Sequence, residues 1–248
     1  MARFRIEAFP ALDSTSTELR RRAEDGAANI DGLVIVAQTQ SAGRGRLGRS
    51  WVDQPGGSLL FSLGWRAPVD ASRLAGLSLA VGVALAQALE HEGVAPVQLK
   101  WPNDLLFRHC KLGGILIETV NAEPAQVDVI IGIGINVELG SAVRDAIPAA
   151  VTDLADAGWR GDRSLLLARI LGELGDVLDR FASEGFSPYR AAWVARHALQ
   201  QRNVTIWRSG HEIAAGRAVD VDEDGALLLR TPTGVRRFTS GESTLRSV

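Results

Sequence analysis

Glycine and arginine alternate in the run GRGRLGRSW at residues 43–51. Arginine forks match phosphate oxygens two at a time, and glycine lets the main chain approach a ligand and expose its N–H groups. Trp51 adds a flat apolar face. The run fits the G-x-G-x-x-G fingerprint of dinucleotide-binding turns, but loop residues follow the glycines where that turn needs a helix, so we reject that interpretation. A solvated basic loop is the alternative to the anion-binding loop that we favour.

Lysine occurs only at Lys100 and Lys111, so 25 of the 27 basic residues are arginines. Chance is one explanation, and a need for a compact ammonium at these two places is the other. Lys100 opens the segment KWPND, in which Pro102 fixes the backbone and Asn103-Asp104 favour a turn. Lys111 precedes two glycines and an apolar strand, a position that can aim its ammonium at a ligand on that strand. A lysine at an exposed strand end is the alternative.

The segment GIGINV at residues 132–137 places two glycines inside an apolar strand, which indicates close approach of a ligand or of another backbone. Asn136 lies at the end of that run. Its amide either faces a ligand or is buried in the core with all its hydrogen bonds made to the protein. The chain lacks the Walker A sequence, so any ATP must bind by another route. Cys110 has no evident catalytic partner, and metal-ligand spacing is missing among the four histidines, His91, His109, His197 and His211.

Composition narrows the function classes. A net charge of −2 argues against nucleic-acid binding through bulk charge, and a single cysteine excludes an intrachain disulfide framework. No apolar run approaches the roughly 18–20 residues that cross a bilayer. The first residues are too charged, and too broken by Pro10, for a secretory signal. We therefore expect a cytoplasmic protein without membrane contact.

The hydrophobic pattern predicts strands and helices in a mixed order. Thr15 and Glu18 have capping-box spacing at the start of the first helix. The strands at 111–120 and 127–137 are continuous apolar runs, typical of a sheet covered on both sides. We expect strands at 3–9, 32–40, 59–65, 97–104, 111–120 and 127–137, and helices at 13–28, 72–90, 164–181 and 188–198.

After Gln201 the character changes to short β segments separated by turn residues. They lie at 204–207, 212–221, 226–230 and 235–238. The fold class predicted is α+β: a mixed-sheet domain over residues 1–199 that binds the ligands, followed by a small β-barrel over residues 200–248.

Taken together, these segments resemble biotin–protein ligases over essentially the whole chain. The resemblance rests on LDSTSTEL, GRGRLGRSW, KWPNDLL, KLGGILIE, GIGINV and the ending DEDGALLLRTPTGVRRFTSGESTLRS, in that order. It implies the mixed-sheet catalytic domain of biotin and lipoate ligases with an SH3-like C-terminal barrel. The implied activity is that of a biotin–[acetyl-CoA-carboxylase] ligase: ATP and Mg²⁺ are used to make biotinyl-5′-adenylate, and biotin passes to a lysine of a biotin carboxyl carrier protein.

The resemblance also implies site residues. Arg46, Arg49 and Lys111 would be catalytic, and Asp104 would hold the metal. Biotin would contact Ser14, Thr15, Ser16, Gln40, Gly43, Arg44, Gly45, Arg46, Lys111 and Gly114. ATP would contact Arg46, Arg49, Trp51, Asn103, Lys111 and Asn136.

Because the chain begins almost at the first catalytic strand, we expect a monofunctional ligase without the helix-turn-helix domain that lets some family members bind DNA. A homodimer and a monomer remain open. A lipoate or octanoate ligase of the same fold is the nearest alternative function, and a binding module without turnover is another. The polar group Ser14, Thr15 and Gln40 suits the ureido ring of biotin better than an acyl chain.

Overall fold

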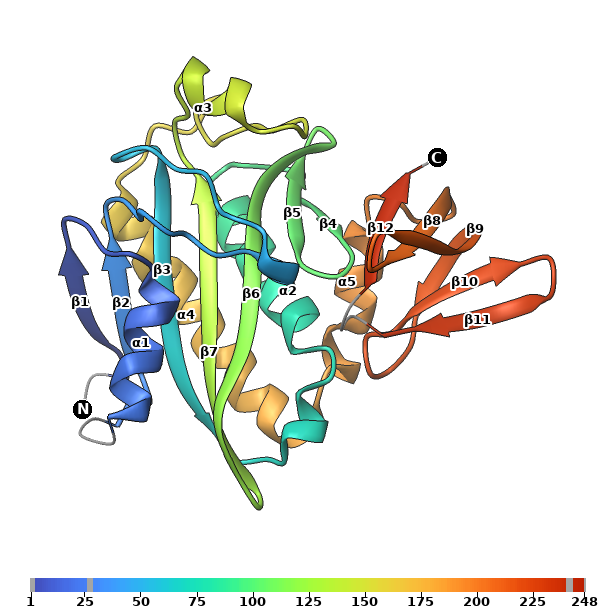
Figure 1. Ribbon diagram of the computed structural model, residues 1–248, viewed down its shortest axis with the longest axis horizontal. Coiled ribbons are helices and arrows are strands. Elements are labelled where there is room, and N and C mark those ends of the chain that lie inside the picture. The colour runs from blue at the N-terminus through green and yellow to red at the C-terminus, as the bar shows by residue number, and fades with distance from the viewer. Residues whose placement is uncertain (1–2, 26–28, 240–242, 248) are drawn as a thin grey trace.

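A seven-stranded mixed sheet is the centre of the computed structural model, which describes residues 3–25, 29–239 and 243–247 (Figure 1). Its strand order is β1-β2-β3-β7-β6-β5-β4, with β1 and β2 parallel and all other neighbours antiparallel. The expected α+β architecture is confirmed. The strands are β1 Arg5–Phe9, β2 Leu33–Ala37, β3 Ser58–Ala67, β4 Gln98–Lys100, β5 Asp104–Phe107, β6 Cys110–Glu123 and β7 Gln126–Asn136.

Helices cover both faces of this sheet. In Figure 1, α1 lies in front of the strands while α2 and α4 lie behind them. No helix in the described part of the chain is long and apolar enough to span a bilayer. The helices are α1 Thr15–Glu24, α2 Leu77–His91, α3 Ser141–Ala146, α4 Arg163–Glu184 and α5 Arg190–Arg196, with 3₁₀ turns at Arg46–Gly48, Ala71–Leu74 and Ser187–Tyr189.

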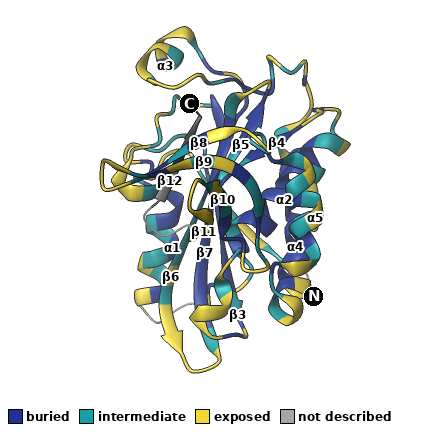
Figure 2. Cartoon of the chain, turned by 90° about the vertical axis from the view of Figure 1, so that its right-hand side faces the viewer, coloured by how far each residue is buried: buried dark blue, intermediate teal, exposed yellow. Residues whose placement is uncertain are grey.

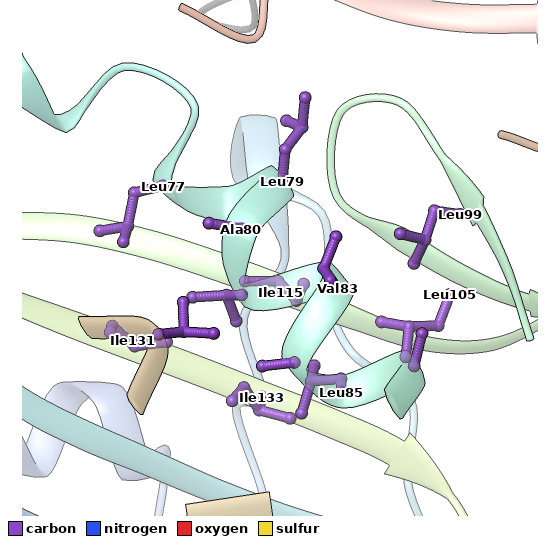
Figure 3. Close-up of a cluster of buried hydrophobic side chains, with 14 of the residues drawn as sticks. Leu77, Leu79, Ala80, Val83, Leu85, Leu99, Leu105, Ile115, Ile131 and Ile133 are labelled. Carbon is purple, nitrogen blue, oxygen red and sulfur yellow. The ribbon is translucent and has the colours of Figure 1, made fainter. Parts of the chain in front are cut away.

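Strand β7 has two different faces, because its residues alternate between isoleucine and glycine. Ile131 and Ile133 pack under α2 with Val83 and other apolar side chains of the main core (Figure 3). Gly132 and Gly134 lie on the opposite face, where a strand normally presents side chains. One face of β7 therefore contributes to the core, and the other face has no side chains at Gly132 and Gly134.

The start of α2 differs from the prediction of a helix from residue 72. Residues 71–74 form a separate 3₁₀ turn, and Gly76 then takes a φ of 80° before the helix begins. A Cβ at Gly76 would lie 2.5 Å from Cβ of Phe186. A left-handed glycine interrupts the helical pattern here, and the hydrophobic periodicity alone does not reveal it.

The predicted capping box at α1 is wrong. Ser14 is the N-cap residue, it makes no side-chain cap, and Thr15 is already the first helical residue. The Thr15 hydroxyl is hydrogen-bonded to the side chains of Gln40 and Ser62, and Glu18 forms a salt bridge with Arg22. Tertiary partners have replaced the local hydrogen bonds that the spacing suggested.

Strand β6 also corrects an expectation, because only its first half is covered on both sides. Residues 112–115 are buried, whereas residues 121–123 at the end of the strand are exposed. In Figure 2 the tip of the β6–β7 hairpin stands out as an exposed end. The sequence changes from the mainly apolar ILIE to the more polar TVNAE where the strand becomes exposed to solvent.

The C-terminal segment forms a five-stranded antiparallel sheet with the order β11-β10-β9-β8-β12. Among the described residues no pairing joins β11 to β12, so the expected barrel is an unclosed small sheet. We propose the domain boundary at residues 199/200, since α5 ends at Arg196 and the first strand of this sheet begins at Asn203. The strands are β8 Asn203–Arg208, β9 His211–Val221, β10 Leu227–Thr231, β11 Gly234–Phe238 and β12 Ser243–Ser247.

The two parts are joined close to the turn between β4 and β5. The indole Nε1 of Trp101 donates to the carbonyl of Gly225 at 3.1 Å. The C-terminal sheet thus holds the backbone of the KWPND segment in place.

His197 is buried at this junction, with 6% of its surface exposed. Its Nδ1 donates to Oε1 of Gln200 at 3.0 Å, its ring lies 4.6 Å from that of Trp193, and no described residue partners its buried Nε2. Burial lowers the pKa of His197 to about 4, opposed by the Gln200 hydrogen bond and the charge of Asp220. The imidazole is therefore neutral at neutral pH.

This lowered pKa predicts acid sensitivity. Below pH 6.5, the pKa of histidine in the unfolded chain, the unfolded chain binds a proton that the folded chain does not bind. The free energy of unfolding therefore decreases as the pH is lowered, until the pKa of the folded state is reached. We expect His197 to cost about 3 kcal/mol of unfolding free energy between pH 6.5 and 4. Urea unfolding across that window should show a shallower pH dependence for His197→Phe. Parallel curves for the two proteins would contradict this.

Candidate active site

One pocket opens on the α1 face of the sheet, where the start of α1, the 43–51 loop, the β4–β5 turn and strands β3, β6 and β7 meet. Thirteen of the fifteen predicted site residues line it. These are Ser14, Thr15, Ser16, Gln40, Arg44, Gly45, Arg46, Arg49, Trp51, Asn103, Asp104, Lys111 and Gly114.

One end of the pocket is neutral and polar. The Thr15 N–H donates to Oε1 of Gln40 at 2.7 Å, and the Thr15 hydroxyl lies 3.1 Å from the same oxygen. Oγ of Ser62 lies 2.7 Å from the Thr15 hydroxyl and 2.9 Å from the Ser16 hydroxyl. Thr15, Ser16 and Ser62 are all buried, so this cluster is fixed in place and suits an uncharged polar group.

The floor of the pocket is made of glycines on paired strands. Gly114 of β6 pairs with Gly134 of β7, and the indole of Trp51 lies over both. A Cβ at Gly134 would be 2.8 Å from Cζ2 of Trp51. The Nε1 of Trp51 is buried, and no described residue accepts from it. The close approach that the sequence predicted at Gly134 is thus made by a tryptophan from the arginine–glycine loop.

Gly132 should be intolerant of any side chain. A Cβ there would lie 2.6 Å from Oγ of Ser16, which is short and held by Ser62. We expect Gly132→Ala to raise the KM for the ligand of the polar end about tenfold, on the order of 1.4 kcal/mol, with little change in KM for a nucleotide. Gly172→Ala on α4 is the matched control, since nothing lies within 4 Å of its added methyl. Equal KM values for both variants would contradict the assignment.

The opposite end of the pocket is cationic. The Lys111 ammonium lies 2.7 Å from Oδ1 of Asp104 and 5.7 Å from the ring centre of Trp51. Nη1 of Arg46 donates to Oδ1 of Asn103 at 3.3 Å. Burial lowers the pKa of the Arg46 guanidinium, with Asp104 acting to raise it and Arg49 to lower it further. This desolvation makes the cation a stronger partner for an anion that enters the pocket.

The 43–51 loop is folded back on itself above this end. The Trp51 N–H donates to the Gly43 carbonyl and the Gly45 N–H to the Arg49 carbonyl. Leu47 at the tip has a φ of 58° and is half exposed. The predicted loop is therefore a hydrogen-bonded turn that places Arg46 and Arg49 in the lining of the pocket.

The Arg44 side chain pairs with an acidic residue of the sheet. Its Nη2 donates to Oε1 of Glu118 on β6 at 2.6 Å, and Arg20 of α1 donates to the same oxygen at 2.9 Å. Arg44 lines the pocket, but its guanidinium is paired with this carboxylate. In this structure it ties the loop to β6.

Gly43 and Asn136 do not line the pocket. The Asn136 amide is buried and donates to the carbonyls of Thr152 at 2.9 Å and Lys111 at 3.3 Å. This arrangement fits the alternative of a satisfied core asparagine, which fixes the backbone of Lys111 from behind.

Sequence reasoning missed several lining residues. Trp101 and Pro102 line the pocket from the β4–β5 turn, and Leu245 lines it from the C-terminal sheet, which packs beside that turn. Ser62 lies behind the polar end rather than in the lining, and it carries no motif signal. A second groove adjoins the first and shares Lys100, Asp104 and Lys111 with it. It is also lined by Arg202 and Arg217 from the C-terminal part, which no local pattern links to the site.

A magnesium ion would find one carboxylate here. Asp104 lies in the pocket with Asn103 beside it, and the described residues contain no group of three metal-ligating side chains. Mg²⁺ bound with a nucleotide takes one or two carboxylates and fills its other positions with phosphate oxygens and water. Asp104 fits that limited role.

The biotin/lipoate A/B protein ligase family matches residues 8–136, and the C-terminal domain of biotin protein ligases matches residues 202–245. The chain is 34% identical over 242 residues to the bifunctional ligase/repressor BirA of Salmonella typhimurium, covering 98% of this chain and 74% of that protein. The chain belongs to the biotin/lipoate A/B protein ligase family. Within this family it is also 34% identical to the biotin–[acetyl-CoA-carboxylase] ligase of Paracoccus denitrificans, covering 93% of this chain and 96% of that one.

A solved family structure agrees over nearly the whole fold. The biotin protein ligase of Aquifex aeolicus in complex with biotin and ATP superposes with a TM-score of 0.82 at 29% identity, covering 98% of this chain and 99% of that one. The chain and this member of the biotin/lipoate A/B protein ligase family therefore share one fold over nearly their whole length.

Proposed function

We infer that this chain is a biotin–protein ligase, which activates biotin with ATP and transfers the biotinyl group to a lysine of a biotin carboxyl carrier protein. One observation carries the inference: a single pocket joins a neutral hydrogen-bonding end, a glycine floor and a cationic end. Biotin has a matching sequence of groups, from its ureido ring to its carboxylate. The names of the relatives point the same way.

In the first step a carboxylate oxygen of biotin attacks the α-phosphorus of ATP, and the bond from that phosphorus to the bridging oxygen breaks. Pyrophosphate leaves and biotinyl-5′-adenylate remains. Two anions must meet for this to happen, and Arg46, Arg49 and Lys111 supply fixed positive charge where they meet. We propose that pyrophosphate leaves along the adjoining groove, which is lined by Arg202 and Arg217.

In the second step the neutral amine of an acceptor lysine attacks the biotinyl carbonyl. The C–O bond to AMP breaks, AMP leaves with its electron pair, and the nitrogen loses its proton. The amide product needs no covalent intermediate on the enzyme. Lys111, placed beside the carboxylate end, can stabilise charge on AMP as it departs.

Bound Mg²⁺ would neutralise phosphate charge and favour departure of pyrophosphate. Asp104 is the carboxylate that we propose for it. Asp104 also holds the Lys111 ammonium at 2.7 Å, so it positions that lysine whether or not a metal is present.

We place the reaction in the cytoplasm, where ATP and newly made carrier proteins meet. The proposed acceptor follows the names of the relatives, which include a biotin–[acetyl-CoA-carboxylase] ligase.

Exchange of labelled pyrophosphate into ATP tests this function. Exchange that requires biotin, and that lipoate or octanoate does not support, is the expected result. Exchange with lipoate or octanoate alone would indicate a ligase for that acid. No exchange with any acid, together with measurable biotin binding, would indicate a binding module.

A further inference from the structure

Ser62 lies on β3 beneath the polar end of the pocket and is fully buried. Its Oγ touches the hydroxyls of both Thr15 and Ser16, and the Thr15 hydroxyl continues to Oε1 of Gln40. The four side chains form one hydrogen-bonded chain with Gln40 at one end and Ser16 at the other. Within it, Ser62 links Thr15 to Ser16.

The direction of this chain is fixed by the backbone. The Thr15 N–H can only donate, so the atom of Gln40 that it meets at 2.7 Å is the amide oxygen. The Thr15 hydroxyl must supply the hydrogen for its own 3.1 Å contact with that oxygen. Each hydroxyl has one hydrogen, so Thr15 accepts from Ser62, and Ser62 in turn accepts from Ser16.

The two ends of the chain therefore face the pocket with opposite polarity. Ser16 has donated its hydrogen inward, so its oxygen offers only lone pairs to a ligand. Gln40 has turned its oxygen toward Thr15, so its Nε2 offers N–H groups. A ligand with an N–H beside a C=O satisfies both, as a cyclic urea does.

We propose that Ser62 is a positioning residue that makes the Ser16 hydroxyl an acceptor, and so selects a cyclic urea over rings that lack an N–H at that end. The proposal rests on the proposed function, which supplies biotin as the ligand. Ser62 touches Thr15 and Ser16 rather than the ligand itself. Without its hydroxyl, the hydroxyl of Ser16 is able to rotate and present a donor where the urea also presents one.

Replacement of Ser62 by alanine should weaken biotin binding about tenfold, as measured by calorimetry without nucleotide. At saturating biotin, kcat and the KM for ATP should stay within about twofold of the unchanged chain. Ser58→Ala is the matched control, because Ser58 is a buried serine on the same strand that lies outside the pocket lining and outside this hydrogen-bonded chain. We expect that variant to bind biotin as the unchanged chain does.

The deciding measurement compares biotin with its cyclic carbamate analogue, in which the ring N–H that faces Ser16 is replaced by a ring oxygen. In the unchanged chain Ser16 offers only lone pairs to that oxygen, so biotin should be preferred. In Ser62→Ala the Ser16 hydroxyl can turn and donate to the ring oxygen, so the preference for biotin should fall about tenfold. Ser62→Cys keeps a side chain of similar size that is only a weak hydrogen-bond donor, so its preference for biotin should lie between those of the unchanged chain and Ser62→Ala. This second variant also tests the proposal if the alanine variant folds poorly. Affinities for both ligands that fall by the same factor would mean that Ser62 only packs, and would overturn the proposal. Loss of the proposed function would look different: the unchanged chain would show no biotin-dependent exchange.

Discussion

Replacing Lys111 with alanine is expected to lower the rate of biotin-dependent pyrophosphate exchange by about 10²–10³-fold, the usual loss when one donor to a developing charge is removed. The Lys111 ammonium is held by Asp104 at 2.7 Å and lies beside the Trp51 ring, at the end of the pocket assigned to the carboxylate and the α-phosphate. Single-turnover formation of biotinyl-5′-adenylate, followed at saturating substrates, measures the effect directly.

Lys111→Arg separates charge from shape. The planar guanidinium keeps the charge but is larger than an ammonium, and the space beside Asp104 and Trp51 fits the compact group. We expect this variant to remain at least about tenfold slower than the unchanged chain. Adenylate formation by Lys111→Ala within about threefold of the unchanged chain, with an unchanged melting temperature, would exclude Lys111 from the reaction.

Arg46→Ala should cause a loss of similar size, about 10²–10³-fold in adenylate formation. Arg46 is half-buried, whereas Arg44 and Arg49 are exposed, and it donates to Asn103 across the pocket. A buried guanidinium can bind a carboxylate and a phosphate oxygen at once through its fork. We therefore expect the KM values for biotin and ATP to rise as kcat falls, which rapid-quench measurements at varied biotin and ATP will resolve.

Arg46→Lys keeps a charge without the fork, and it should recover only part of the lost rate. Arg180→Ala is the control, since Arg180 pairs with Glu184 on the exposed face of α4 and contacts no part of the site. A fully active lysine variant would show that Arg46 acts as a point charge, and an active alanine variant would remove it from the mechanism.

Much of the fold could be predicted because its signals are local. The apolar runs at β6 and β7, the buried pattern of α2 and the turn residues after Gln201 each identify an element from a few neighbouring residues. The elements that escaped prediction are short or depend on others. Helix α3 has six residues, and β12 is a short strand set by its pairing with β8.

The candidate site divides in the same way. Arg46, Lys111 and the glycines of β7 stand in recognisable segments, so the sequence places them in one site through its family resemblance. Ser62 meets Thr15 from 47 positions away, and the Arg44 guanidinium meets Glu118 from 74 positions away. Such contacts depend on how strands align in the sheet, and no spacing in the chain records them.

The path of the carboxylate oxygen during turnover tests the main chemical step most directly. Biotin with both carboxylate oxygens replaced by ¹⁸O should be turned over with ATP and a carrier protein, and the nucleotide product analysed by mass spectrometry. Attack on the α-phosphorus predicts AMP that contains one ¹⁸O, together with unlabelled pyrophosphate. ADP with ¹⁸O in inorganic phosphate would mean attack on the γ-phosphorus, and would contradict the roles given to Arg46 and Lys111.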